Sequence, residues 1–208
     1  MFEETTLIID ACGERVKMSL AKNGEQIFET VSDRQAIEGA AQCALALPVE
    51  LREIRAYAIC TGPGSMLGTR FASAFASTLA KLSDAEIFEW DAMLAAAYAI
   101  ADGGAEAEFS LVAPSRRGFA NIVNFANGGV ELEAEIELER LDGTAKQKKF
   151  LLRQRKSDFD FEEFDPSPRQ LFETLKKHPE LAKKCELPPD AKPLSKREYV
   201  KWKGQAHI

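Results

Sequence analysis

The chain has 208 residues, of which 45% are hydrophobic and 29% charged, and its formal net charge is −6 at pH 7. This composition is typical of a globular protein of one domain or two small lobes, and the negative charge argues against nucleic-acid binding by the surface as a whole. No apolar run approaches the roughly 20 residues that cross a bilayer, and Met1–Glu4 does not begin a signal peptide, so we expect a cytoplasmic protein without membrane contact.

The first half of the chain reads as a regular alternation of strands and helices. Val16, Met18 and Leu20 alternate with polar residues, and Asn23-Gly24 is a strong two-residue hairpin signal. Asp91 is a helix cap, and Gly103-Gly104 stops that helix. The predicted order is strands 5–11, 15–21 and 25–31, helix 34–47, strand 54–61, helix 66–82, strand 85–90 and helix 91–101. Three antiparallel strands followed by helix, strand, helix and strand indicate a ribonuclease H-like lobe.

The second half is less regular. Asn127-Gly128-Gly129 predicts a turn between two strands, and Ser167 caps a final helix that begins at Pro168. We expect strands 107–113, 118–126, 130–140 and 149–154, an acidic and aromatic loop at 157–165, and helix 168–177. The fold class predicted is α/β, with an N-terminal lobe over residues 1–104 and a smaller lobe over 105–208.

A glycine-rich turn joins the predicted strand 54–61 to helix 66–82. Its Gly62, Pro63, Gly64 and Ser65 could hold backbone N–H groups towards an anion, and Ser65 could cap the helix. A tight strand-to-helix turn without a ligand asks for the same residues, so both interpretations stay open. The spacing is not that of a P-loop, since no lysine follows Gly68, and not that of a dinucleotide-binding loop.

The segment Gly62-Pro63-Gly64-Ser65-Met66-Leu67-Gly68-Thr69-Arg70 resembles the G-P-G-S-[FY]-T-G-[LI]-R signature of the TsaB (YeaZ) family. The opening Leu7-Ile8-Ile9-Asp10 is similar to that family's first strand, and Pro193-Leu194-Ser195-Lys196-Arg197 resembles its P-x-Y-L-R ending. The resemblance implies a two-lobed actin-like (ribonuclease H-like, ASKHA) fold. It also assigns Gly62, Pro63, Gly64, Ser65, Gly68, Arg70 and Asp10 to a phosphate or turn motif.

The chain departs from the family pattern at several places. The family has Asp-Thr-Ser after its first strand, whereas Asp10 is followed here by Ala11 and Cys12, which removes two hydroxyls. The D-A-R-x-x-E-V-Y strand is represented only by Pro114-Ser115-Arg116-Arg117-Gly118-Phe119. The sequence therefore resembles a divergent member.

Two predicted helices are almost free of charge. Glu38 is the only charged residue between Gln35 and Leu47, and Lys81 the only one between Phe71 and Leu82. Helices without a polar side are buried all round, either by a second layer of the same chain or by another chain. The resemblance favours another chain, because these helices in TsaB proteins pair with TsaD or a second TsaB. The internal core is expected to hold Phe71, Phe75, Leu79 and Leu82. The expected interface consists of small residues at helical spacing: Gly39, Ala40, Cys43, Ala44, Ser73, Ala76, Ser77 and Ala80.

Residues for chemistry are few. His178 and His207 have no partner at metal-ligand spacing, H-E-x-x-H is absent, and no nucleophile–base pair can be assembled. Asp10 is either a magnesium-phosphate acid of the actin-like fold or, more simply, a turn-capping residue. The cysteines lack C-x-x-C spacing and are predicted to be reduced thiols: Cys12, Cys43, Cys60 and Cys185. We predict neither a metal nor a cofactor.

A basic run is predicted to be a solvated face, with contact to tRNA phosphates as the alternative: Lys146, Lys148, Lys149, Arg153, Arg155 and Lys156.

The resemblance implies a non-catalytic subunit that supports TsaD in transferring a threonylcarbamoyl group to the adenosine beside the tRNA anticodon. Its expected partners are a TsaD-like catalytic subunit and a TsaE-like ATPase, with a homodimer when alone and only indirect contact with tRNA. Two alternatives remain. One is a small actin-fold ATPase or phosphotransferase that uses Asp10 and the 62–65 turn, and the other is a homodimeric scaffold no longer tied to tRNA modification.

Overall fold

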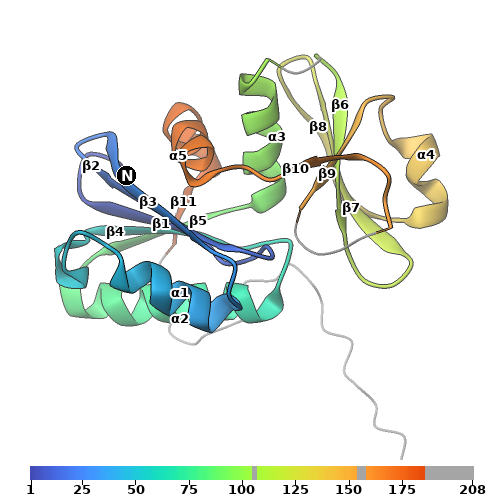
Figure 1. Cartoon of the computed structure of the whole chain (residues 1–208). Coiled ribbons are helices and arrows are strands. Elements are labelled where there is room, and N and C mark those ends of the chain that lie inside the picture. Colours follow the sequence, from blue (N-terminus) through green and yellow to red (C-terminus); the bar gives the residue numbers. More distant parts are fainter. Residues whose placement is uncertain (105–106, 154–157, 186–208) are drawn as a thin grey trace, which may run out of the picture.

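A computed structural model describes residues 1–104, 107–153 and 158–185 of the chain (Figure 1). Two β-sheets lie on either side of a helical layer. The first has six strands in the order β11-β5-β4-β1-β2-β3, and the second has five in the order β10-β9-β6-β7-β8. The resemblance motif Pro193–Arg197, together with Trp202, His207, Arg155 and Lys156, lies outside the described residues.

The N-terminal strands form the predicted meander. β1 (Thr6–Asp10), β2 (Val16–Lys22) and β3 (Glu25–Ser32) pair antiparallel in succession. Asn23 and Gly24 turn the β2–β3 hairpin with φ values of 54° and 76°, the left-handed conformation that this dipeptide favours. β4 (Ala56–Cys60) then pairs parallel to β1, and β5 (Glu86–Trp90) parallel to β4. The ribonuclease H-like order predicted from the sequence is confirmed.

Helices cover both faces of this sheet (Figure 1). α1 (Ala36–Leu45) and α2 (Met66–Ser83) lie side by side on one face, whereas α3 (Ala92–Asp102) and α5 (Pro168–Lys177) lie on the other. β1 is buried on both sides: Leu7 and Ile9 pack toward α1 and α2, while Ile8 faces the layer between the sheets. Burial on both faces explains why this strand is an unbroken apolar run in the sequence.

The second sheet packs on α3 through β6 (Phe109–Pro114) and β7 (Phe119–Ala126). The rings of Phe109 and Phe125 stack with their centroids 5.2 Å apart. The ring of Tyr98 in α3 meets that of Phe125 edge-on, with a centroid distance of 5.3 Å. The remaining strands are β8 (Gly129–Glu137), β9 (Lys149–Leu152) and β10 (Glu162–Phe164). The short helix α4 (Leu141–Thr144) covers the outer face, where Leu141 packs with Val112 and Ile122.

Short elements were missed by the sequence analysis. Residues 138–144, expected partly as strand, form a 3-10 turn followed by α4, and the expected loop 157–165 contains β10. Pairing with β9 rather than local propensity makes β10 a strand, since Glu162, Glu163 and Phe164 align with Phe150, Leu151 and Leu152.

The chain returns to the first sheet near its end. α5 packs on β2 and β3, and β11 (Lys183–Cys185) pairs antiparallel with β5. The division into lobes 1–104 and 105–208 stays a prediction, and residues 168–185 complete the first sheet and its cover rather than the second sheet.

Candidate functional site

The carboxyl ends of β1 and β4 meet at one edge of the first sheet. Their register is parallel, with Leu7 opposite Tyr57 and Ile9 opposite Ile59. Two loops leave the sheet from these ends, one over residues 11–15 and the other over 61–65, which leads into α2. Loops at the carboxyl ends of adjacent parallel strands are where α/β proteins commonly place a site.

The glycine turn is held tightly against the first loop. A Cβ at Gly68 would lie 1.7 Å from the Ala11 carbonyl oxygen, and one at Gly64 would lie 2.3 Å from the Cys12 carbonyl oxygen. The backbone N–H of Ser65 donates to that Cys12 oxygen at 2.7 Å. The turn therefore uses its glycines to let a neighbouring backbone approach, which favours the structural interpretation of this motif.

The other residues of the motif cap α2, form the turn before it or lie on its exposed side. Ser65 Oγ accepts a hydrogen bond from the Gly68 N–H at 3.1 Å and so caps α2 as predicted. Gly62 has φ +102°, and Pro63 follows it in the turn. Arg70 lies on the exposed side of the first turns of α2.

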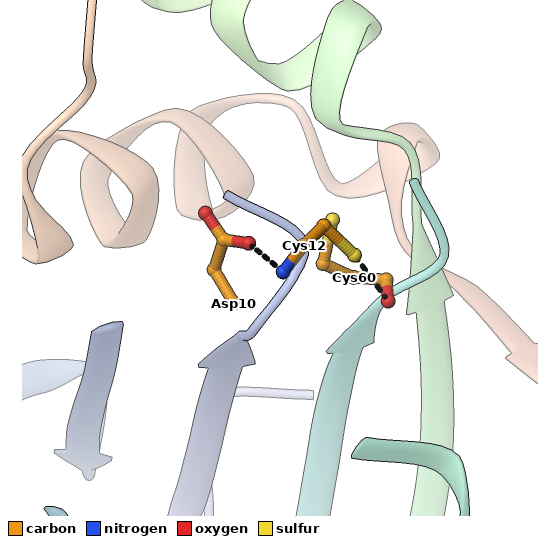
Figure 2. A group of neighbouring side chains, drawn as sticks. All are labelled: Asp10, Cys12 and Cys60. Carbon is orange, nitrogen blue, oxygen red and sulfur yellow. Dashed lines mark hydrogen bonds between the residues drawn. The ribbon is translucent and has the colours of Figure 1, made fainter. Parts of the chain in front are cut away.

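Asp10 lies beside two thiols that the sequence separates (Figure 2). Its Oδ1 accepts a hydrogen bond from the Cys12 N–H at 3.0 Å. Cys12 Sγ is 3.4 Å from the Cys60 carbonyl oxygen and 3.3 Å from Thr69 Oγ1. One carboxylate oxygen of Asp10 and the two sulfur atoms of Cys12 and Cys60 all lie within 4.8 Å of one another. The predicted capping role of Asp10 is supported, and the structure adds a compact group of metal-ligand atoms around it.

This group is buried, and burial controls its protonation. Cys12 and Cys60 have no exposed surface and Asp10 only 8%. Burial raises the pKa of the Asp10 carboxyl above its ordinary 3.8, and the attraction of the Lys17 ammonium offsets only part of this rise. Burial, followed by the neighbouring Cys12 thiol and the Asp10 charge, raises the pKa of the Cys60 thiol well above its ordinary 9.0.

A charged network joins this site to the loop before α5. Lys17, only 5% exposed, pairs with Asp165 and lies 3.9 Å from Asp10 Oδ2. Arg15 pairs with the other oxygen of Asp165. The sequence analysis missed Asp165, because nothing local in the acidic loop distinguishes it from its neighbours and Lys17 is 148 positions away.

The structure corrects the expected interface of small residues, because most of them are buried in the chain's own core. Ala40, Cys43, Ala76 and Ala80 are at most 1% exposed and pack in the core below the first sheet. Ser73 and Gly39 are buried as well, and Ala44 and Ser77 are half-buried. A Cβ at Gly39 would lie 2.9 Å from Val16 Cγ2, so small residues here let α1 approach the chain's own sheet. They do not form the outer face of these helices.

The outer face instead carries large apolar side chains. Ile37 and Leu45 of α1 are 53% and 88% exposed, and Leu67 and Leu82 of α2 are 54% and 77% exposed. Leu82 was assigned to the internal core, which is wrong, and its companions Phe71, Phe75 and Leu79 are only half-buried. We call Ile37, Leu45, Leu67 and Leu82 the outer apolar stripe.

The described part of the basic run is paired with carboxylates. Lys146 lies 2.9 Å from Glu131, Lys148 lies 2.6 Å from Glu162, and Arg153 lies 3.5 Å from Glu14. These pairs favour the solvated-face interpretation over contact with tRNA. His178, near the end of α5, contacts Asp102 Oδ2 at 3.1 Å and packs on Tyr98 at 4.5 Å.

No protein-family model matches the chain, and no curated protein matches it. Two solved structures from Pseudomonas aeruginosa are similar to it. One, described as an uncharacterized protein with similarity to peptidase YeaZ, has a TM-score of 0.65 and 18% identity, covering 90% of this chain and 97% of its own. The other, YeaZ, has a TM-score of 0.64 and 17% identity, covering 91% and 98%. The chain therefore shares the α/β fold of these YeaZ structures, and the α/β fold class expected from the sequence is confirmed. Within the described residues, no helix is long and apolar enough to cross a membrane.

Proposed function

We propose that this protein is a divergent TsaB-type subunit that acts without chemistry of its own. It pairs with a TsaD-like catalytic subunit, which transfers a threonylcarbamoyl group to the adenosine beside the tRNA anticodon, and a TsaE-like ATPase joins the assembly. The observation that carries the proposal is the fold overlap with YeaZ, which spans 98% of that chain. The G-P-G-S turn supports it, because the segment that resembles the family signature packs its glycines tightly against the loop that follows β1.

The outer apolar stripe supports a role as a subunit. Leucines exposed by 77% and 88% on adjacent helices leave apolar surface in water, which a partner would cover. In the absence of TsaD the same stripe would pair two copies of this chain. The cytoplasm is the compartment in which such an assembly would meet tRNA.

The geometry around Asp10 does not favour the phosphotransferase alternative. The carboxylate accepts the Cys12 N–H and faces Lys17, so its charge is directed to the chain's own groups. The Ser65 N–H, which could have met a phosphate, donates to Cys12.

Copurification from the native cell tests the proposal. The tagged full chain is expected to retain TsaD-like and TsaE-like proteins, and its depletion should lower threonylcarbamoyladenosine in tRNA measured by mass spectrometry. A Leu82→Glu variant should lose the partners, whereas Leu138→Glu, at a leucine 41% exposed outside the stripe, should keep them. Recovery of this chain alone, with the modification unchanged after depletion, would contradict the proposal and favour the homodimeric scaffold.

A further inference from the structure

Asp10, Cys12 and Cys60 come together from two neighbouring strand ends. Asp10 ends β1, Cys60 ends β4, and Cys12 follows two residues after Asp10. Figure 2 shows the two cysteine side chains lying against each other, with Asp10 held by its bond to the Cys12 N–H. Their three ligand atoms lie within 4.8 Å of one another in a region closed to solvent.

We propose that these three side chains bind one thiophilic divalent cation, with Zn²⁺ as the ordinary biological occupant. Thiolate sulfur selects zinc over magnesium or calcium, and a carboxylate is a common additional zinc ligand. Zinc bonds of about 2.3 Å to sulfur and 2.1 Å to oxygen place the ligands of a tetrahedral site about 3.5–3.8 Å apart. The ligand atoms of the present cluster, which lie within 4.8 Å of one another, need to approach by at most about 1.3 Å, which side-chain rotation can supply.

The charges and remaining ligands also suit such a cation. Two thiolates and one carboxylate carry one negative charge more than the divalent cation neutralises. Lys17, whose ammonium lies 3.9 Å from Asp10 Oδ2, and Arg15 both pair with Asp165, and their two positive charges balance Asp165 and the excess charge of the site. Thr69 Oγ1, 3.3 Å from Cys12 Sγ, or a water molecule can supply the fourth ligand. Binding releases the two thiol protons to solvent.

A cation here would join the 11–15 loop to β4. That loop already packs against Gly64 and Gly68, so the metal would tie together the two strand ends that hold the glycine turn. This role is independent of the proposed partnership, and its test needs no partner.

The test uses Co²⁺ as the probe on the full-length chain, kept reduced and stripped of metal with a chelator. We expect one Co²⁺ per chain, a near-ultraviolet thiolate charge-transfer band and intense visible bands of tetrahedral cobalt. Zn²⁺ should displace the cobalt, because a tetrahedral site with thiolate ligands favours zinc. Zn²⁺ should also raise the melting temperature of the chain.

The chain has four cysteines, which gives a sharp control. A Cys43→Ser/Cys185→Ser variant retains only Cys12 and Cys60 as thiols and should keep the full charge-transfer band. Cys12→Ser, Cys60→Ser and Asp10→Asn should each weaken cobalt binding at least tenfold, with Cys→Ala variants used where a serine variant does not fold. A parent without the charge-transfer band, or a double variant that loses it while remaining folded by circular dichroism, would overturn the proposal.

Discussion

Gly68 lies inside α2, where glycine is normally an unfavourable residue. Alanine is normally the better helix former by about 1 kcal/mol, but a Cβ at this position would overlap the Ala11 carbonyl oxygen at 1.7 Å. Because that oxygen is backbone, relief requires the 11–15 loop or α2 to move. We expect Gly68→Ala to lower the free energy of unfolding by about 2–3 kcal/mol, measured by urea denaturation.

Gly143 provides the matched control. It lies in α4, and a Cβ there would meet nothing within 4 Å. Gly143→Ala should leave stability unchanged or slightly raised. Equal stability of Gly68→Ala and the parent would show that the close approach to Ala11 is not needed.

The Lys17–Asp165 pair should make stability depend on pH. Burial alone would raise the pKa of Asp165, but hydrogen bonds and attraction from Lys17 and Arg15 outweigh it and lower that pKa below 3.8. A carboxyl whose pKa is lowered in the folded state stabilises the protein at pH values above its ordinary pKa. This stabilisation is lost as the pH falls through the folded-state pKa. Asp165→Asn also leaves the nearly buried Lys17 without this partner, so we expect a loss of about 3 kcal/mol at pH 7.

Denaturant unfolding of parent and Asp165→Asn between pH 7 and acid checks this. The difference in the free energy of unfolding between the two proteins should be largest at neutral pH. It should shrink below about pH 4, where the carboxyl of the unfolded chain takes up its proton. Asp158→Asn is the control, since Asp158 is exposed in the loop before β10, whereas Asp165 follows β10. A difference that grows as the pH falls would contradict the assignment.

At the scale of elements, α1 and α2 each have a buried side of small residues, and each carries large apolar side chains on its exposed side. Ala76 has no exposed surface and Leu82 is 77% exposed. Leu82→Glu and Leu45→Glu should therefore change the stability of the isolated chain by no more than about 0.5 kcal/mol. Ala76→Glu buries an unpaired charge and should cost several kcal/mol.

Thermal melts and light scattering separate these effects. The leucine variants should melt like the parent yet fail to associate, whereas Ala76→Glu should melt at a much lower temperature. A parent that stays monomeric at high concentration and binds no partner would show that the outer apolar stripe is not an interface.

At the scale of the whole molecule, α5, which lies late in the chain, packs against residues near the start of the chain. Phe172 is 1% exposed and meets Phe2 edge-on at 5.3 Å, and Lys176 Nζ donates to the Gly24 carbonyl oxygen at 2.7 Å. Phe172→Ala should cost about 3–5 kcal/mol. Because α5 packs against both α3 and the first sheet, we expect unfolding to remain one transition.

Far-ultraviolet circular dichroism and Trp90 fluorescence, read in a Trp202→Phe background, should give coincident denaturation midpoints for the parent. The two probes should coincide again for Phe172→Ala, at a lower denaturant concentration. Two separated midpoints would show that the first sheet unfolds apart from α5 and the second sheet.

Local signals in the sequence predicted most of the regular elements. Apolar alternation located β2, and Asn23-Gly24 specified the β2–β3 hairpin, because a two-residue turn with positive φ selects those residues. Ser167 and Pro168 began α5 where expected, with Ser167 Oγ accepting the Gln170 N–H at 3.1 Å. The glycines of the 62–68 turn were recognised from their place between a strand and a helix and from the resemblance to a family signature, whereas their packing against Ala11 and Cys12 was not. For the hairpin and the helix cap, the cause lies within a few residues of the effect.

Only the tertiary structure decided which side of each helix is buried and which distant residues share a site. A helix with almost no charge has no polar face from which its orientation can be predicted, so the small residues of α1 and α2 were assigned outward although they pack inward. Cys12 and Cys60 are 48 positions apart, and Lys17 and Asp165 are 148 apart. Such pairs depend on strand order and on the return of the chain to its first sheet, which no local pattern contains.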